Sequence, residues 1–167
     1  MKHLQDIVTE SLLDDEDEIM DKAYDVSTNP FLFLARTPKD ICDDHSRFIE
    51  VLWKVESLIK QNAKLVIEYK RAKSAKYRIA MGYDSMMAPR MYIKCGRKSY
   101  LIRGQAFSGK IQPYVMVLTP EQGSSHFENN GPYYIPNAKL MKEMDEFVEA
   151  YFAGRKNMDA WNKYIGK

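Results

Sequence analysis

The hydrophobic period of this chain changes at Lys64, and this change constrains the fold more than any other feature. Before it, apolar residues repeat at alternating three- and four-residue spacing, which predicts one long helix over residues 38–61. Thr37, Pro38 and Asp40 suit a helix cap and first turn, so we expect the helix to begin there. The apolar stripe contains Ile41, His45, Phe48, Ile49, Val51, Leu52, Val55, Leu58 and Ile59.

From Lys64 onward, apolar residues alternate with polar ones, as a half-buried strand requires. The first such segment, residues 64–70, is followed by four similar ones with short turn candidates between them. Short connections favour antiparallel pairing, because a parallel crossover needs about a dozen residues or more. The pattern therefore predicts an antiparallel sheet of four or five strands. The four further segments are 76–83, 90–95, 99–107 and 112–118.

The C-terminal part of the chain returns to helical spacing after a stretch without periodicity. Residues 120–136 are rich in Gly, Ser and Asn, which predicts a long loop. Asn137 then caps a helix over residues 137–153, and Gly154 is expected to end it before a final helical turn or two. The expected fold class is α+β, with the sheet packed against the 38–61 helix and the C-terminal helices.

The first 34 residues are expected to form a short helical arm, separate from a single α+β domain over residues 35–167. Acidic and turn residues divide their apolar side chains into three patches, and isolated helices this short are marginal in water. We therefore expect the arm to dock onto a partner, with docking onto the same molecule's sheet as the alternative. The patches are Leu4, Ile7, Val8 and Leu12, then Ile19 and Met20, then Phe31, Leu32, Phe33 and Leu34.

Residues 4–25 read LQDIVTESLLDDEDEIMDKAYD, a short amphipathic helix followed by a Leu-Leu-Asp-Asp-Glu-Asp patch. This segment resembles the starts of small uncharacterised proteins of tailed bacteriophages, including crAss-like phages of gut Bacteroides. The resemblance implies a phage origin, and with it a location in the host cell cytoplasm or in the virion. It implies no single activity, because such proteins include virion parts, host-takeover factors and anti-defence proteins.

Charge is distributed unevenly along the chain, although the net charge is only +2. Residues 1–53 hold 13 acids and 5 bases, whereas residues 54–112 hold 3 acids and 14 bases. Cations neutralise phosphates and exposed rings stack on bases, so a basic sheet with tyrosines predicts nucleic-acid binding. The alternative is that the acidic N-terminal part folds across the sheet and neutralises it. The candidate cations are Lys70, Arg71, Lys73, Lys76, Arg78, Arg90, Lys94, Arg97, Lys98 and Arg103, beside Tyr69, Tyr77, Tyr83, Tyr92 and Tyr100.

Catalytic and metal-binding patterns are weak in this sequence. The three histidines fall in different expected elements and the two cysteines lie far apart, so we expect no metal site and no cofactor. The complete phosphate-binding motifs G-x-x-x-x-G-K-[ST] and G-x-G-x-x-G do not occur. Glu68 and Lys70 form an E-x-K pair on an expected strand, the arrangement that PD-(D/E)xK nucleases use to hold a metal and position water. Those nucleases need another acid on a preceding strand, and here a helix precedes, so we expect no catalytic residues.

The sequence therefore favours a non-enzymatic binding protein that acts by protein–protein interaction, in virion assembly or in interference with host functions or defence. Nucleic-acid binding is the first alternative and a metal-dependent nuclease the second. The expected partner is another protein or a second copy of the chain, with no membrane contact, because no segment approaches the ~20 apolar residues of a membrane span. The interface candidates, the aromatic ones provided that they are exposed, are Leu4, Ile7, Leu12, Trp53, Phe127, Tyr133 and Tyr134.

The expected location is the cytoplasm. The first ten residues contain charged side chains in place of the apolar core of a secretion signal. Cys42 and Cys95 are expected to be free thiols, which fits a reducing compartment.

Overall fold

Six strands form one antiparallel sheet in the order β1-β6-β2-β3-β4-β5. A computed structural model of the chain describes residues 28–83, 89–104 and 111–167. The α+β class expected from the sequence is confirmed, with six strands in place of four or five. The strands are β1 (Ala63–Val66), β2 (Tyr77–Gly82), β3 (Arg90–Cys95), β4 (Lys98–Arg103), β5 (Tyr114–Leu118) and β6 (Tyr133–Pro136). The helices in these ranges are α2 (Pro30–Ala35), α3 (Lys39–Cys42), α4 (His45–Ile59), η2 (Lys60–Asn62, a 3-10 turn), α5 (Tyr69–Ala72), α6 (Pro120–Asn129), α7 (Ala138–Lys156) and α8 (Met158–Ile165).

The order of the strands separates two parts of the sheet. β2 to β5 form a meander in which each strand pairs with the next one in the chain. β6 comes from the C-terminal half and lies between β1 and β2. Because β1 and β2 are each antiparallel to β6, they run parallel to one another. The chain from Val66 to Tyr77 therefore crosses over β6, and this crossover contains α5.

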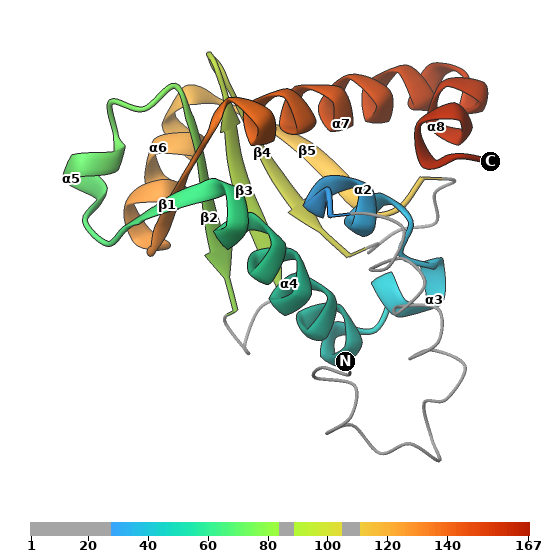
Figure 1. Cartoon of the computed structure of the whole chain (residues 1–167), viewed down its shortest axis with the longest axis horizontal. Helices are drawn as coiled ribbons and strands as arrows, with labels where there is room; N and C mark the ends of the chain where they lie inside the picture. The colour runs from blue at the N-terminus through green and yellow to red at the C-terminus, as the bar shows by residue number, and fades with distance from the viewer. Residues whose placement is uncertain (1–27, 84–88, 105–110) are drawn as a thin grey trace.

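Helices from both ends of the chain cover one face of the sheet (Figure 1). α4 and α7 lie across this face, as the sequence predicts, and α2 and α8 pack beside them. Ile79, Ile93 and Ile102 of the sheet form the core with Phe48 and Phe147 of the helices. All five side chains are fully buried, so this layer is the main source of hydrophobic stabilisation.

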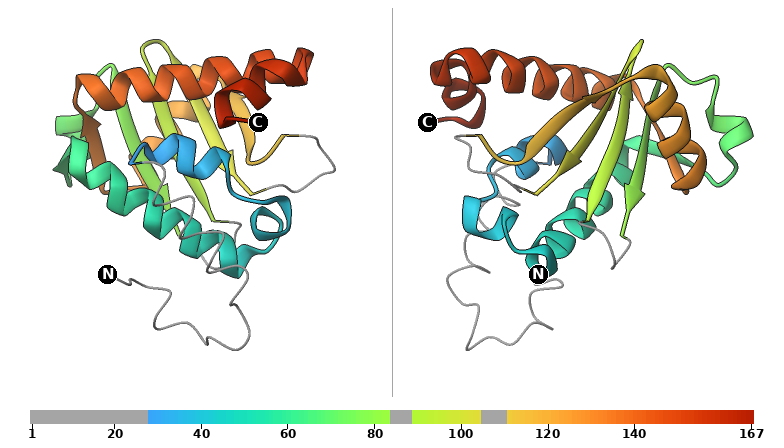
Figure 2. Two further views of the ribbon diagram at one scale, coloured as in Figure 1. Left: turned by 45° about the vertical axis from the view of Figure 1, so that its right-hand side comes forward. Right: turned by 180° about the vertical axis from the view of Figure 1, so that it is seen from behind.

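α6 packs on the opposite face of the sheet, and the short helix α5 also contributes to this layer (Figure 2). Phe127 of α6 contacts a second, smaller core that includes Tyr92 and Leu101 of the sheet. Gly123 allows this close approach, because a Cβ atom there would lie 2.8 Å from the hydroxyl oxygen of Ser99. The sheet is thus partly covered on both faces, by α2, α4, α7 and α8 on one and by α5 and α6 on the other.

The helix expected over residues 38–61 is broken into α3 and α4. Asp44 interrupts it by capping α4, since its side chain accepts hydrogen bonds from the backbone N–H groups of Ser46 (2.9 Å) and Arg47 (3.2 Å). The break turns His45 to the surface, so its interpretation as part of the buried stripe was wrong. Phe48 and the later residues of the stripe are buried as expected, except Ile49, which is partly exposed.

The long loop expected over residues 120–136 is instead α6 and β6. A capping box starts α6: the Gln122 N–H donates to the Thr119 hydroxyl (3.2 Å), and the Thr119 N–H donates to the Gln122 side chain (2.9 Å). Pro120 fits the first helical position. The prediction was wrong because Gly123, Ser124 and Ser125 lie within this capped helix and do not form a loop.

The described residues before α3, 28–38, belong to the domain and not to an arm. Asn29 caps α2 by accepting from the N–H groups of Phe31 (2.9 Å) and Leu32 (3.1 Å), and Pro30 is the first helical residue. Phe31 and Leu34 are fully buried, so the boundary expected after residue 34 falls within a packed helix. Residues 1–27, with the phage-like segment and the candidates Leu4, Ile7 and Leu12, lie outside the described residues.

Gly154 lies inside α7 and does not end it. α8 turns back after Asn157 and places Trp161 against this glycine, where an added Cβ atom would lie 2.6 Å from the Trp161 Cβ. The glycine is therefore needed for the packing of two helices and not for a helix stop.

We predict that Gly154→Ala lowers the free energy of unfolding by about 1–2 kcal/mol, as measured by urea denaturation. In an exposed helix interior the same change stabilises a protein by about 1 kcal/mol. A loss of stability here would therefore show that the added methyl group meets Trp161 of α8. Ala153→Gly, at the exposed neighbouring position, is the control and should lose about 1 kcal/mol through helix propensity alone. A more stable Gly154→Ala protein would contradict the close packing of α8 on α7.

Candidate nucleic-acid interface

The fold divides the ten candidate cations into three groups. Six are exposed and lie at one end of the sheet, on the β1–β2 crossover and the β3–β4 turn. Arg78 and Lys94 face each other across β2 and β3 near this end, and Arg90 and Arg103 lie at the other end of the sheet. We call the six exposed residues the basic end: Lys70, Arg71, Lys73, Lys76, Arg97 and Lys98.

Two backbone features hold the basic end together. Gly96 has φ +68°, a conformation that favours glycine, and it allows the tight turn that exposes Arg97 and Lys98. The Gly96 N–H donates to the Lys76 carbonyl oxygen at 2.9 Å, which places the end of the crossover beside this turn. Cations from two separate segments of the chain therefore share one surface.

The described acids next to the basic end include Glu68 in the crossover and Asp145 of α7, which accepts a hydrogen bond from Tyr77, the neighbour of Lys76. Glu68 is the only acid among the described residues from 64 to 104, and its carboxylate lies 3.8 Å from Arg71. Both side chains of this pair are largely exposed, so water screens the contact and it neutralises little of the surface. The basic end therefore carries an excess of positive charge.

Lys94 supports the basic end from behind. Its ammonium group donates to the Gly96 carbonyl oxygen at 2.7 Å and so braces the β3–β4 turn. Burial lowers the pKa of Lys94, and the nearby charges of Arg78 and Lys76 lower it further. This residue is partly buried and is better placed to hold the turn than to contact a partner.

Arg78 is a structural residue, although the sequence places it with the surface cations. It is only 4% exposed, and its Nη1 donates to the Ala72 carbonyl oxygen at 3.1 Å. The guanidinium group lies 5.3 Å from the ring centroid of Tyr69 and 4.8 Å from that of Phe127, which are cation–π distances. Burial lowers its pKa. Arg78 thus holds both α5 and α6 against the sheet and cannot reach an external phosphate.

Arg90 and Arg103 lie apart from the basic end. They face each other across β3 and β4, and the Arg103 guanidinium lies 5.4 Å from the Tyr114 ring centroid. Arg90 and Cys95 are at opposite ends of β3, which corresponds to roughly 17 Å at about 3.3 Å per residue. These two arginines therefore do not form one continuous patch with the turn cations.

The tyrosines of the sheet do not form a stacking platform. Tyr92 and Tyr100 are buried. The Tyr77 hydroxyl donates to Asp145 at 2.7 Å, which raises the Tyr77 pKa to about 12, and the Tyr83 hydroxyl donates to Glu56 at 2.8 Å. The remaining ring, Tyr69, is half-buried against Tyr133. Base stacking by these rings, which the sequence predicts, is not supported by their positions.

Three of the four described interface candidates are buried. Phe127, Tyr133 and Tyr134 are at most 2% exposed, so the condition of exposure is not met for them. The Tyr133 hydroxyl donates to the Phe127 carbonyl, and the Tyr134 hydroxyl donates to the Glu56 carboxylate. Trp53 is 45% exposed on α4 and remains available to a partner.

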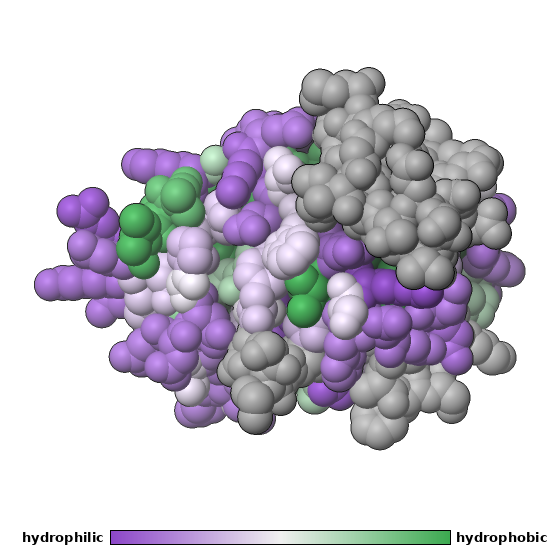
Figure 3. Space-filling view, turned by 90° about the horizontal axis from the view of Figure 1, so that it is seen from below, coloured by the Kyte–Doolittle hydropathy of each residue, from purple (hydrophilic) through white to green (hydrophobic). Residues whose placement is uncertain are grey.

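Sequence reasoning missed an apolar patch at the edge of the sheet. Leu65 is 51% exposed and Ile67 is 76% exposed, and both belong to β1 or directly follow it. Figure 3 shows apolar residues together at the end of the molecule where β1 and α5 lie. In the sequence, Leu65 and Ile67 alternate with Val66 and Glu68, which predicts a strand with one buried face. β1 is the edge strand of the sheet, and the covering helices do not extend over this part of it, so Leu65 and Ile67 stay exposed.

The E-x-K pair does not have the geometry of a nuclease site. β1 ends at Val66, and Glu68 precedes α5 while Lys70 lies within it, so the two are not on one face of a strand. In the described part of the chain, His, Cys, Asp and Glu side chains nowhere form a group of three that could hold a metal ion. The expectation of a strand over residues 64–70 was wrong at its C-terminal half.

The two cysteines are free in the structure. Burial raises the pKa of both Cys42 and Cys95 to about 12, so the thiols stay protonated and are poor nucleophiles.

Every helix within the described ranges is too short or too polar to cross a membrane.

We predict that Arg78→Lys lowers the free energy of unfolding by about 2 kcal/mol, because the ammonium group cannot contact two rings and a carbonyl at once. The matched control is Arg97→Lys at the exposed turn, which should stay within about 0.5 kcal/mol of the unchanged protein. Equal effects of the two substitutions in chemical denaturation would show that Arg78 has no special structural role.

Comparison of the chain with protein-family models, with curated proteins and with solved structures gives no match.

Proposed function

We propose that this chain is a non-enzymatic binding protein whose basic end binds the phosphate backbone of a nucleic acid. The observation that supports this best is the exposure of six cations at one end of the sheet. Glu68 is the only acid in the described segments that carry them, residues 64–83 and 89–104. Burial of three expected aromatic anchors, Phe127, Tyr133 and Tyr134, weakens the competing proposal of an interface built on them. The exposed positive charge is therefore better evidence for the chemistry of the partner than the aromatic residues are.

The expected mode of binding is electrostatic and independent of base sequence. Lysine and arginine side chains on flexible connections neutralise phosphates and release counterions, which supplies affinity without reading bases. Of the candidate tyrosines, Tyr92 and Tyr100 are buried and the other three are only partly exposed, which limits stacking on bases. α5 has only four residues, too few to serve as a recognition helix in a groove. We infer a protein that binds nucleic acids of many sequences with similar affinity.

The acidic residues 14–18 compete with a nucleic acid for the same surface if they fold onto it. Replacing these five carboxylates by amides in the full-length chain would then raise the affinity for nucleic acid. If the phage origin implied by residues 4–25 holds, the bound polymer would be viral or host nucleic acid in the host cytoplasm, or the genome in the virion.

We predict that the full-length chain binds duplex DNA with an affinity that falls steeply between about 50 and about 200 mM salt, by a slope of roughly −0.9 per phosphate contact. The variant Lys76→Gln/Arg97→Gln/Lys98→Gln should weaken binding and make this slope shallower by up to about 2.7, because up to three contacts are lost. Fluorescence anisotropy with labelled duplexes of two unrelated sequences measures both effects.

The control for this experiment is Arg155→Gln/Lys156→Gln/Lys163→Gln, which removes the same charge from exposed positions on α7 and α8. It should leave the slope nearly unchanged if contact is confined to the basic end. Absence of binding at low salt, or equal losses in the two triple variants, would refute the proposal.

A second candidate function is protein binding at the β1 edge. Among the strands of the described residues, β1 pairs with β6 alone, so its other edge presents backbone groups without a strand partner there, beside the exposed Leu65 and Ile67. Such an edge can accept a strand from another chain, and apolar side chains next to it add affinity. The partner could be a second copy of this chain pairing through the same edge.

We predict that Ile67→Lys lowers the mass of any self-associated form, as measured by light scattering, because it places a charge beside the edge. Lys64→Gln, an exposed substitution on the same strand, serves as the control and should leave the mass unchanged. A full-length protein that is monomeric at all concentrations would exclude pairing of two copies through this edge.

A further inference from the structure

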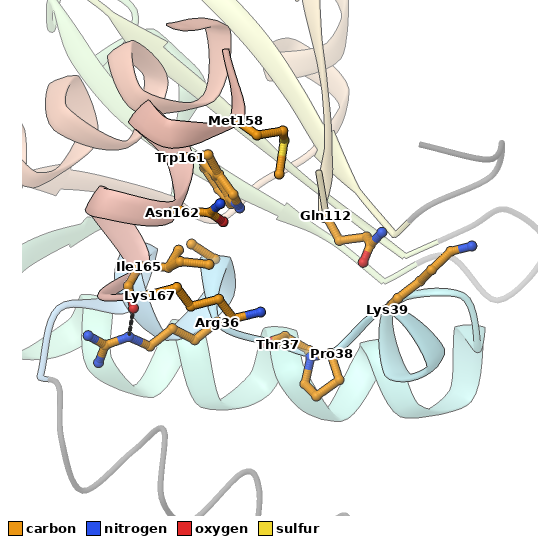
Figure 4. Close-up of a pocket in the computed structure, with 11 residues that line it drawn as sticks. Arg36, Thr37, Pro38, Lys39, Gln112, Met158, Trp161, Asn162, Ile165 and Lys167 are labelled. Carbon is orange, nitrogen blue, oxygen red and sulfur yellow. Dashed lines mark hydrogen bonds between the residues drawn. The ribbon is translucent and has the colours of Figure 1, made fainter. Parts of the chain in front are cut away.

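A cavity of about 400 Å³ lies between α2, α8 and the chain before β5 (Figure 4). This is the opposite end of the molecule from α5, so the cavity is separate from the basic end (Figure 1). Its volume falls in the range of about 300–1,000 Å³ typical of small-molecule sites. The lining residues include Arg36, Lys39, Gln112, Met158, Trp161 and Lys167.

The return of α8 toward α2 creates the cavity. Asn157 caps α8 by accepting from the Asp159 N–H at 2.9 Å, and Trp161 then packs on Gly154. The Arg36 Nε donates to the Ile165 carbonyl oxygen at 2.9 Å and ties the end of α2 to the end of α8. Figure 4 shows the guanidinium group directed toward this carbonyl. The walls are therefore fixed by contacts between two helices.

The chemistry of the walls is divided between apolar and cationic parts. Trp161, 3% exposed, lines the cavity together with Met158 and Ile165, all from α8. Lys39 and Lys167 bring positive charge from two other segments, and Figure 4 shows the Lys167 side chain extending into the space between α8 and Pro38. The Lys39 ammonium lies 3.8 Å from Asp43, but both groups are exposed and the pair is weak.

Amide groups complete the polar side of the cavity. Gln112 and Asn162 belong to the lining, and Figure 4 shows the Gln112 amide directed toward the side of the cavity where Lys39 lies. Amides donate hydrogen bonds to phosphate or carboxylate oxygens. The lining residues include three cations and no Asp or Glu. The nearest acid described beside one of these cations is Asp43, outside the lining, which forms the weak exposed pair with Lys39, so an anionic group would meet mainly donors.

We propose that this cavity binds a small organic anion, a phosphate or carboxylate carried on an aromatic or apolar body. The body lies against Trp161, Met158 and Ile165, and the anionic group faces Lys39, Lys167 and the Gln112 amide. Either half alone gives weak binding, because the ligand needs both the apolar contact and the charge. The proposal involves none of the residues of the basic end and stands whether or not the chain binds nucleic acid.

The two tryptophans of the chain make a direct test practical. Trp161 lines the cavity, whereas Trp53 lies on α4 outside its lining. Phenyl phosphate is titrated into the full-length ¹⁵N-labelled protein, and the two indole N–H signals are assigned with Trp53→Phe. We expect a saturable shift of the Trp161 signal with no saturable shift of the Trp53 signal. Phenol and inorganic phosphate, which each carry one half of the ligand, should bind at least about tenfold more weakly.

Two charge variants then test the polar side. Lys39→Gln/Lys167→Gln should weaken phenyl phosphate binding by about fivefold, because both facing charges are lost. Lys156→Gln/Lys163→Gln removes the same charge outside the lining and should change binding by less than about twofold, the size expected of screened charges. Absence of a saturable Trp161 shift, phenol binding as tight as phenyl phosphate, or equal losses in the two variants would each overturn the proposal.

Discussion

The pairing of β6 with both β1 and β2 is the constraint on which the rest of the structure depends. Tyr133 and Tyr134 are neighbours on this strand, so their side chains point to opposite faces of the sheet. Tyr134 belongs to the core under α4 and α7 and donates to Glu56 of α4. Tyr133 belongs to the core under α6 and donates to the carbonyl of Phe127. One strand of four residues therefore joins the two layers of the molecule.

The same pairing determines where the positive charge lies. With β6 between them, β1 and β2 cannot be joined by a tight turn, and the connection from Val66 to Tyr77 has to pass over β6. Ala72 is the buried residue of this crossover, and its carbonyl accepts from Arg78. The lysines and arginine around Ala72 are left exposed. A buried arginine on the sheet thus positions the exposed cations of the connection.

The sequence is informative where neighbours in the chain are also neighbours in space. Short apolar segments between turn residues identify β2 to β5, and Asn137 marks the start of α7, because these signals need no distant partner. β6 gives a weaker signal, because it has only four residues and follows a segment rich in Gly, Ser and Asn. The positions of basic residues could be predicted as a group. Their division into a buried Arg78, an exposed end and a separate arginine pair depends on the crossover, which only the pairing of β6 reveals.

The exposed cations of the crossover contribute little to the stability of this protein. They make few contacts with either core, whereas Tyr69, Ala72 and Arg78 hold the crossover to the sheet. Substitutions at the cationic positions can therefore accumulate with little cost to folding. Related chains could carry weaker, stronger or even reversed charge at this end while they keep the same six strands. The fold in this way allows the electrostatic character of one surface to evolve independently of the core beneath it.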